Sequence, residues 1–328
     1  MRRRDFIKGF IGATTAWPLA ARGQQQTIPV VGVVSGRSRL AEERSAAAFH
    51  KGLGETGYVD GQNVTVEYHW VEGKYDQLPA LMADLVRRQV AVIATTGNNA
   101  TALAAKAATA TIPIVFAVGL GPVKLGLVAS LARPGGNATG INDFLNEVDA
   151  KRLRLLHDLV PKASRVAVLV NPANAASAEG TLAGAQEAAA PMGLQIRILN
   201  ATTIAEIDAA FASFAQERPE ALFVGADAFF ATRAVQFITL TARDRIPATY
   251  SLRDYVIAGG LMSYGADLAE IAHQVGRYTG NILKGAKPAD LPVQQSTKFN
   301  FAINLQTARA LGIEVPSGVL SIADEVIE

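Results

Sequence analysis

Residues 90–108 read VAVIATTGNNATALAAKAA, and this stretch contains one complete repeating unit of the fold. Its first part, Val90–Thr95, is a short apolar run with β-branched residues, which is typical of a buried strand. Its last part, Asn98–Ala108, is rich in alanine and predicts a helix. A strand that leads directly into a helix is the building block of a parallel sheet covered by helices.

The same alternation extends outward from this unit in both directions. The run Ile28–Val34 is apolar on both faces, as a central parallel strand must be, and predicts the first strand. The other elements expected in this first series are strands at Val64–Trp70, Ile112–Ala117 and Ala138–Asn142 and helices at Ala41–Glu55, Leu78–Gln89 and Val123–Leu131.

A second series begins after a helix at Val148–Leu159, which Pro161 ends. It contains expected strands at Arg165–Val170, Leu194–Leu199, Ala221–Val224, Pro247–Tyr250 and Leu261–Tyr264, separated by helices at Ala175–Ala190, Ile204–Glu217, Thr232–Arg243 and Arg253–Ala258. A long helix at Asp267–Leu283 and a last strand near Phe299–Leu305 follow.

The two series predict an α/β fold of two doubly wound parallel-sheet lobes joined by a multi-crossover hinge. We expect one lobe to comprise residues 28–142 and 265–298, and the other to comprise residues 143–264 and 299–328. Because no linker rich in Pro, Gly or Ser separates the two series, the lobes should pack closely together.

Residues 1–23 are expected to be a twin-arginine export signal. The pair Arg3-Arg4 stands in a basic stretch that precedes a mildly apolar run, residues 9–20, and small residues follow this run. The run is broken by Pro18 and is shorter than the ~20 residues that span a bilayer. No cysteine follows for a lipid anchor, so we expect cleavage after Gly23 and a soluble periplasmic protein that is not membrane-embedded.

The charge balance argues against nucleic acid as a partner. The chain has 31 Lys+Arg and 29 Asp+Glu, and its first 23 residues contain five of these bases and one of these acids. Without that segment, 26 bases face 28 acids and the net charge is −2. A nucleic-acid-binding protein gathers an excess of Lys and Arg to neutralise phosphates.

Motifs for catalysis, metals and cofactors are missing from the sequence. There is no cysteine, no phosphate-binding Gly-x4-Gly-Lys-Ser/Thr loop and no Gly-x-Ser-x-Gly elbow. The glycines at Gly119, Gly121 and Gly126 follow a strand but do not have the dinucleotide-binding spacing. We therefore expect no enzyme activity, no catalytic residue, no metal site and no cofactor.

Ligands of open parallel sheets bind at the carboxyl ends of the strands. The turn Thr95-Thr96-Gly97-Asn98 offers two hydroxyls, a close backbone approach and a helix N-terminus, which favour a carboxylate. The same residues are equally typical of ordinary helix capping. The full set of expected ligand-binding residues is Ser35, Thr95, Thr96, Asn98, Gly119, Asn171, Asp227, Tyr250 and Arg253.

Two of these residues have alternative interpretations. Arg253 either clamps a ligand carboxylate beside Tyr250, or it is a solvated surface arginine or forms a salt bridge with Asp254 or Asp227. Asp227 itself either binds a polar group of the ligand or caps the next helix. If the chain is a receptor, we expect Thr95, Thr96 and Tyr250 to share one cavity.

The sequence resembles the ABC transporter substrate-binding proteins related to tryptophan-type and other aromatic-ligand receptors. The resemblance covers essentially the whole chain after the signal and is carried by the segments PIVFA (113–117), GLVASLARPGGNATG (126–140), GGLMSYG (259–265), ILKG (282–285) and PADLPVQ (288–294). It implies a type I periplasmic binding fold whose lobes close around the ligand. It also implies that Ser35, Thr95 and Thr96 hold the ligand's carboxylate.

The sequence departs from this family at one place. Relatives often carry Asp before the proline that corresponds to Pro122, whereas this chain has Gly121. The ammonium group of an amino-acid ligand would lack that partner. We therefore hypothesise an aromatic or aliphatic carboxylate ligand without an amine.

Taken together, these features favour the extracytoplasmic solute-binding protein of an ABC importer, which binds a small organic molecule and docks on permease subunits in the inner membrane. One alternative is an exported hydrolase on the same fold, with Asp227 as general base. Another is a periplasmic sensor protein that presents its ligand to a receptor kinase. A sugar-sensing transcription regulator is disfavoured, because no DNA-binding helix pair precedes the first strand.

Overall fold

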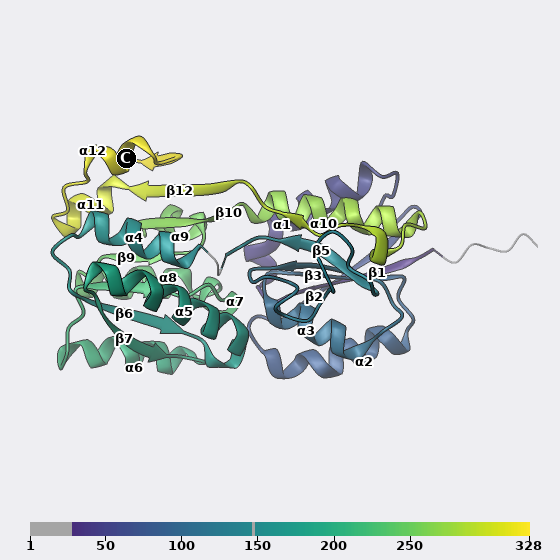
Figure 1. The fold of residues 1–328 in the computed structure, drawn as a ribbon, viewed down its shortest axis with the longest axis horizontal. Helices are drawn as coiled ribbons and strands as arrows, with labels where there is room; N and C mark the ends of the chain where they lie inside the picture. The colour runs from purple at the N-terminus through teal and green to yellow at the C-terminus, as the bar shows by residue number, and fades with distance from the viewer. Residues whose placement is uncertain (1–27, 146–147) are drawn as a thin grey trace, which may run out of the picture.

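A computed structural model of the chain describes residues 28–145 and 148–328, so the expected export signal lies outside the described residues. Two lobes, each a sheet with helices on both faces, lie side by side (Figure 1). This arrangement confirms the predicted α/β fold with two mostly parallel sheets. Among the described helices, none is long and apolar enough to cross a membrane.

The first sheet has the strand order β11-β5-β4-β3-β1-β2, and all its strands are parallel. Its strands are β1 (Val30–Ser35), β2 (Thr65–Trp70), β3 (Val92–Thr96), β4 (Ile114–Val118), β5 (Ala138–Asn142) and β11 (Gln294–Gln295). The helices that cover it are α1 (Arg39–Gly54), α2 (Leu78–Arg87), α3 (Asn99–Ala108) and α10 (Leu268–Leu283).

The second sheet has the order β13-β12-β10-β9-β8-β6-β7, and it is parallel except where β10 pairs with β12. Its strands are β6 (Arg165–Val170), β7 (Gln195–Asn200), β8 (Ala221–Val224), β9 (Ala248–Tyr250), β10 (Met262–Ala266), β12 (Phe299–Asn304) and β13 (Glu325–Ile327). The second lobe also contains α4 (Asp149–Leu159), α5 (Ala175–Met192), α6 (Ile204–Ala212), α7 (Ala228–Ala231), α8 (Ala234–Asp244), α9 (Arg253–Ile257), α11 (Leu305–Leu311) and α12 (Ser317–Ser321).

The chain passes between the lobes three times: between β5 and α4, between β10 and α10, and between β11 and β12. Figure 1 shows the last two connections along the upper side of the molecule. The return of α10 to the first lobe depends on glycines that let it approach α1 closely. A Cβ at Gly276 would lie 2.2 Å from the carbonyl oxygen of Phe49. Three connections of this kind form a hinge that keeps the lobes paired but lets them rotate.

One predicted element is absent. The segment Val123–Leu131, expected as a helix, forms a series of turns instead. Gly126 adopts a left-handed conformation with φ of 71°, which interrupts a right-handed helix. The Ala129 amide donates to the carbonyl of Pro134, which holds the following segment as a loop. The apolar residues of this segment therefore do not form a helical face.

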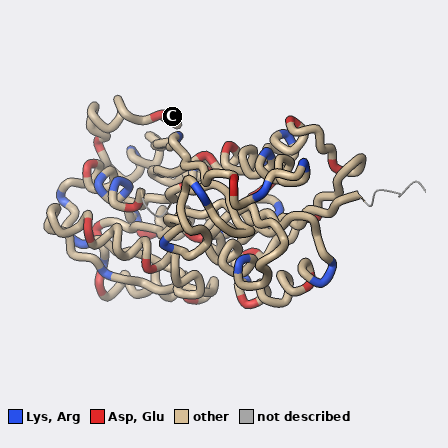
Figure 2. The backbone as a smooth tube through the Cα atoms, turned by 45° about the vertical axis from the view of Figure 1, so that its right-hand side comes forward, with Lys and Arg blue, Asp and Glu red and all other residues tan. Residues whose placement is uncertain are grey.

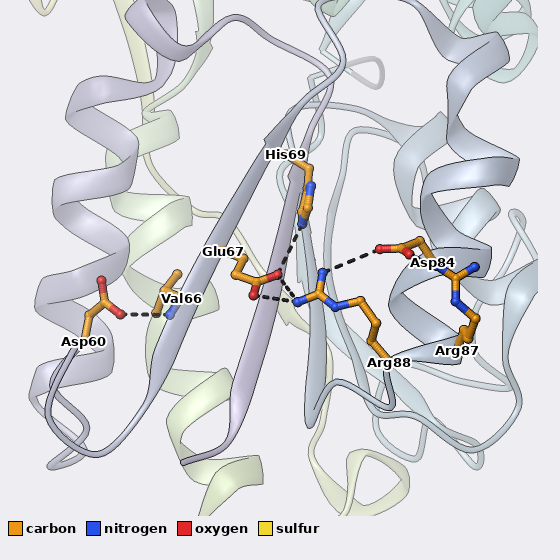
Figure 3. A network of polar contacts seen from close by, with 7 residues as sticks. All are labelled: Asp60, Val66, Glu67, His69, Asp84, Arg87 and Arg88. Atoms are coloured by element: carbon orange, nitrogen blue, oxygen red, sulfur yellow. Dashed lines mark hydrogen bonds and ion pairs between the residues drawn. The ribbon is translucent and has the colours of Figure 1, made fainter. Parts of the chain in front are cut away.

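Charged residues of both signs are interspersed along the backbone of the two lobes (Figure 2). On the first lobe, Glu67 of edge strand β2 accepts hydrogen bonds from Arg88, which follows α2 and also pairs with Asp84 (Figure 3). These side chains are about one third exposed, so water screens their interactions.

We therefore expect the Arg88→Ala variant to lose less than about 1 kcal/mol of unfolding free energy. Urea unfolding followed by circular dichroism measures this change. A loss of several kcal/mol would contradict the view that solvent screens this network.

Candidate ligand site between the lobes

The carboxyl ends of strands from both sheets meet at a narrow space between the lobes. Its central part is a cavity of about 30 Å³. Residues that follow β1, β3, β4 and β5 line it from the first lobe, and residues that follow β8 and β9 line it from the second: Arg37, Gly97, Asn98, Gly119, Asp143, Ala226, Asp227, Ser251 and Leu252. This is the position where open parallel sheets bind ligands.

Two further spaces adjoin the central cavity. One of about 280 Å³ lies beside the β10–α10 connection and shares Arg37, Leu252 and Leu268 with it. The other, of about 10 Å³, shares Gly97, Asp143 and Leu268. Ligand pockets usually occupy about 300–1,000 Å³, so the three spaces together reach the lower end of that range.

Arg37 stands at the junction of the central and the 280 Å³ spaces and is only 3% exposed. Its Nη1 lies 3.3 Å from Glu42 of the same lobe, and its Nη2 lies 3.2 Å from Asp254 of the other lobe. Burial raises the pKa of Glu42, although Arg37 opposes this shift. The remaining donor of Arg37, Nε, is buried without a hydrogen-bond partner among the described residues.

The turn after β3 brings a second buried donor to the same place. Asn98 caps α3, because its side-chain oxygen accepts from the Thr101 amide at 2.8 Å. Its Nδ2 is buried and has no partner among the described residues. The backbone at Gly36 approaches so closely that a Cβ there would lie 1.9 Å from this nitrogen. Glycine at position 36 is therefore required for Asn98 to stand beside the end of β1.

Asp227 does cap α7, which was one of its two expected roles. Its Oδ1 accepts from the amide of Phe229 at 2.9 Å and from the Asn171 side chain at 2.9 Å. Its Oδ2 accepts from Asn174 at 3.0 Å and, across the lobes, from the Tyr75 hydroxyl at 2.8 Å. Asp227 thus lines the central cavity but is already engaged by donors of the protein.

Five of the nine expected ligand-binding residues line one of the three spaces. Asn98, Gly119 and Asp227 line the central cavity, Thr96 lines the 10 Å³ space, and Arg253 lines the 280 Å³ space. Four line none of the three: Ser35, Thr95, Asn171 and Tyr250. The side chain of Ser35 instead accepts from the Arg37 amide at 3.1 Å and so orients the residue that does reach the cavity.

The expectation that Thr95, Thr96 and Tyr250 share a cavity differs from the structure. Tyr250 is fully buried in the core of the second lobe, where its ring stacks on Tyr255 at 4.4 Å. Its hydroxyl lies 3.3 Å from the hydroxyl of Thr241. A ligand cannot reach this ring unless the core repacks. Its neighbours Ser251 and Leu252 line the central cavity in its place.

The pairing of Arg253 also differs from expectation. Its guanidinium forms a two-pronged ion pair with Glu325 of β13, not with Asp254 or Asp227. Because Tyr250 is buried, the two side chains do not form the expected clamp. Arg253 therefore lines the 280 Å³ space as an already paired cation.

Arg37 and Asp143 are cavity residues that the sequence did not single out. Arg37 follows a strand end directly, but a charged residue in a turn usually points to solvent. One of its two ion-pair partners, Asp254, is 217 positions away in the chain. Among the described residues, no group of three or more His, Cys, Asp or Glu side chains could hold a metal ion.

Comparisons with known proteins agree with this architecture. The family model described as "ABC transporter substrate binding protein" matches residues 27–327. The tyrosine-binding protein of Clostridioides difficile is 26% identical over 283 residues, which are 85% of this chain and 81% of that protein.

Two solved structures differ in how well they superpose. The chain is 25% identical to an ABC domain from Streptococcus pneumonia in complex with L-Trp, with a TM-score of 0.81 over 91% of this chain and 99% of that one. It is equally 25% identical to a ligand-free, open substrate-binding protein from Clostridium difficile, but the TM-score is 0.63 over 92% of this chain and 99% of that one. Identity and coverage are nearly the same for the two structures, so this chain superposes better on the structure that contains L-Trp.

The direct contacts between the lobes agree with a closed arrangement: Arg37 pairs with Asp254, and Tyr75 bonds to Asp227. Such closure around a cleft is a common hinge motion of two-lobed proteins. The match of the family model over nearly the whole chain, on two parallel-sheet lobes of the type I periplasmic binding fold, shows that this chain belongs to the ABC transporter substrate-binding protein family.

Proposed function

We propose that this chain acts outside the cytoplasm, binds a small organic carboxylate between its lobes and delivers it to ABC permease subunits in the inner membrane. It is exported by its N-terminal signal and works in the periplasm without catalysing a reaction. This proposal specifies the compartment, the ligand class and the partner for a family whose members bind the substrates of ABC transporters.

The proposal of a carboxylate ligand rests on two unpartnered hydrogen-bond donors at the central cavity. Arg37 Nε and Asn98 Nδ2 are both buried, and neither has a hydrogen-bond partner among the described residues. A buried donor without an acceptor costs about 1–3 kcal/mol, and more when it carries charge. A ligand carboxylate would supply acceptors to both donors and so remove this cost.

The acidic residues of the central cavity, Asp227 and Asp143, already accept hydrogen bonds from the protein. Asp227 is held by the side chains of Asn171, Asn174 and Tyr75, and Asp143 accepts a hydrogen bond from the Leu145 amide. This supports a ligand without an amine, as the glycine at position 121 also does. Relatives named for tyrosine or solved with L-Trp support an aromatic body of similar size.

The engagement of Asp227 disfavours the alternative of a hydrolase. A general base needs a free lone pair that can take a proton from water. The Asp227 carboxylate already caps α7 and accepts from three side chains, so it is built as a structural acceptor.

Thermal denaturation with matched compounds tests the proposal. Each set contains an acid, its amide and the corresponding amine-bearing acid, for example 3-phenylpropionate, 3-phenylpropionamide and phenylalanine. At 100 times the dissociation constant a ligand adds about 2.7 kcal/mol of stability, which is a clear shift in melting temperature. We expect acids to stabilise the protein and their amides to have no effect. The ligand class would be refuted if an acid and its amide stabilised the protein equally. It would also be refuted if no acid stabilised the protein.

A further inference from the structure

The loop between β2 and α2 reaches across the interlobe space, and we name residues Val71–Gln77 the latch loop. It is tied to the end of β1, because the Val71 amide donates to the Ser35 carbonyl at 3.0 Å and the Gly73 amide donates to the Gly36 carbonyl at 2.8 Å. Glu72 and Gly73 both have positive φ, 51° and 78°, which turns the loop sharply. The loop is therefore a fixed extension of the first lobe.

Two contacts join the latch loop to the second lobe. The Tyr75 hydroxyl donates to Asp227 Oδ2 at 2.8 Å. Burial and the adjacent Asp227 raise the pKa of Tyr75 well above its usual range, so the phenol keeps its proton. The second contact is steric: a Cβ at Gly73 would lie 2.4 Å from Cβ of Phe229 and 3.0 Å from its Cα.

The acceptor of this hydrogen bond is held in place within its own lobe. Asn171 donates to one oxygen of Asp227 at 2.9 Å and Asn174 donates to the other at 3.0 Å. The carboxylate also accepts from the Phe229 amide as the cap of α7. Tyr75 therefore meets a preorganised anion, and a hydrogen bond to a charged acceptor is about twice as strong as one between neutral groups.

The contact lies between the ligand cavity and the outside. Asp227 lines the central cavity, whereas Tyr75 and Phe229 line an outer groove of about 560 Å³ that shares no lining residue with that cavity. None of the residues that line the groove belongs to the three connections between the lobes. The hydrogen bond thus joins the lobes at a point away from the hinge, where separating them breaks it.

We propose that Tyr75 is a positioning residue that holds the lobes closed through Asp227 and thereby slows ligand release without touching the ligand. The inference rests on the proposed binding of a ligand between the lobes. In this proposal Asp227 helps to hold the lobes closed. This role explains why Asp227, which follows a strand and lines the cavity, accepts hydrogen bonds from the protein. Loss of one charge-assisted hydrogen bond should make the ligand dissociate at least roughly tenfold faster.

Four variants separate closure from general damage. Tyr75→Phe removes the interlobe hydrogen bond, and its control is Tyr278→Phe, whose hydroxyl donates to the Pro292 carbonyl at 2.6 Å within the first lobe. Gly73→Ala places a methyl group against Phe229. Its control is Gly61→Ala, which has nearly the same φ, 76°, but nothing within 4 Å of the added carbon.

Small-angle X-ray scattering without ligand measures the separation of the lobes directly. We expect Tyr75→Phe and Gly73→Ala to increase the radius of gyration, while Tyr278→Phe and Gly61→Ala leave it at the parent value. Identical scattering by Tyr75→Phe, Gly73→Ala and the parent chain would overturn the proposal.

Stopped-flow dissociation of 3-phenylpropionate, followed by the fluorescence of Trp70 directly before the latch loop, supplies the second measurement. We expect dissociation from Tyr75→Phe to be at least about tenfold faster than from the parent and from Tyr278→Phe. An unchanged rate would refute a role in ligand release. If the parent bound none of the acids in the matched sets, the proposed ligand class would be refuted instead. The scattering comparison would still test closure in that case.

Discussion

The Arg152→Ala variant is expected to lose about 3–5 kcal/mol of unfolding free energy, the largest stability effect that the structure predicts. Arg152 and Asp149 lie one turn apart in α4, and both side chains are fully buried, with 2.9 Å between Nη2 and Oδ1. Arg152 also donates to the carbonyl of Val224 at 3.1 Å and lies over the ring of Phe223. Its removal leaves a buried carboxylate without its partner.

Burial raises the pKa of Asp149 even though Arg152 lowers it, so removal of Arg152 should raise this pKa further. Urea unfolding of the parent and the variant measures the loss. Arg243→Ala is the control, since its pair with Asp244 is exposed and should contribute less than about 1 kcal/mol. If Arg152→Ala lost less than about 1 kcal/mol of unfolding free energy, the ion pair with Asp149 would not be needed for stability.

The Arg37→Met variant is expected to weaken binding of the ligand by about 10- to 100-fold, because hydrogen bonds to charged groups contribute about 1.5–3 kcal/mol. Methionine keeps most of the apolar stem and removes the Nε donor at the cavity. It also removes the interlobe pair with Asp254, so the closed arrangement should become less stable.

Isothermal titration measures this loss of affinity, with an acid that stabilises the protein in the thermal-denaturation experiment as the ligand. Arg44→Met is the matched control, because Arg44 lines the adjoining 280 Å³ space but its side chain is 70% exposed. We expect Arg44→Met to bind within about twofold of the parent, as a screened surface charge contributes little. Equal losses in the two variants would indicate a general electrostatic effect and not a specific anchor.

The strands were accessible to sequence analysis because their apolar runs are bounded by turns. The run at 28–34, for example, predicts β1 to within two residues at its start and one at its end. The exception, residues 123–131, has suitable apolar residues for a helix, but Gly126 adopts a left-handed conformation there. The spacing of apolar residues therefore predicts a helix only when no residue within the segment adopts a conformation that interrupts it.

The site was predicted less completely, for two physical reasons. Side chains alternate between the two faces of a strand, so an error of one residue at a strand end exchanges core and cavity. Tyr250 lies in the core and Ser251 at the cavity for this reason. The place of Arg37 was missed for a different reason: it forms an ion pair with Asp254 of the other lobe, which no local pattern reveals.

A crystal structure of the protein with a bound acid tests the central claim most directly. We expect a ligand carboxylate between the lobes, with its oxygens within about 3.2 Å of both Arg37 Nε and Asn98 Nδ2. A ligand bound outside the interlobe space, or bound there with both of these nitrogens still unpartnered, would contradict it.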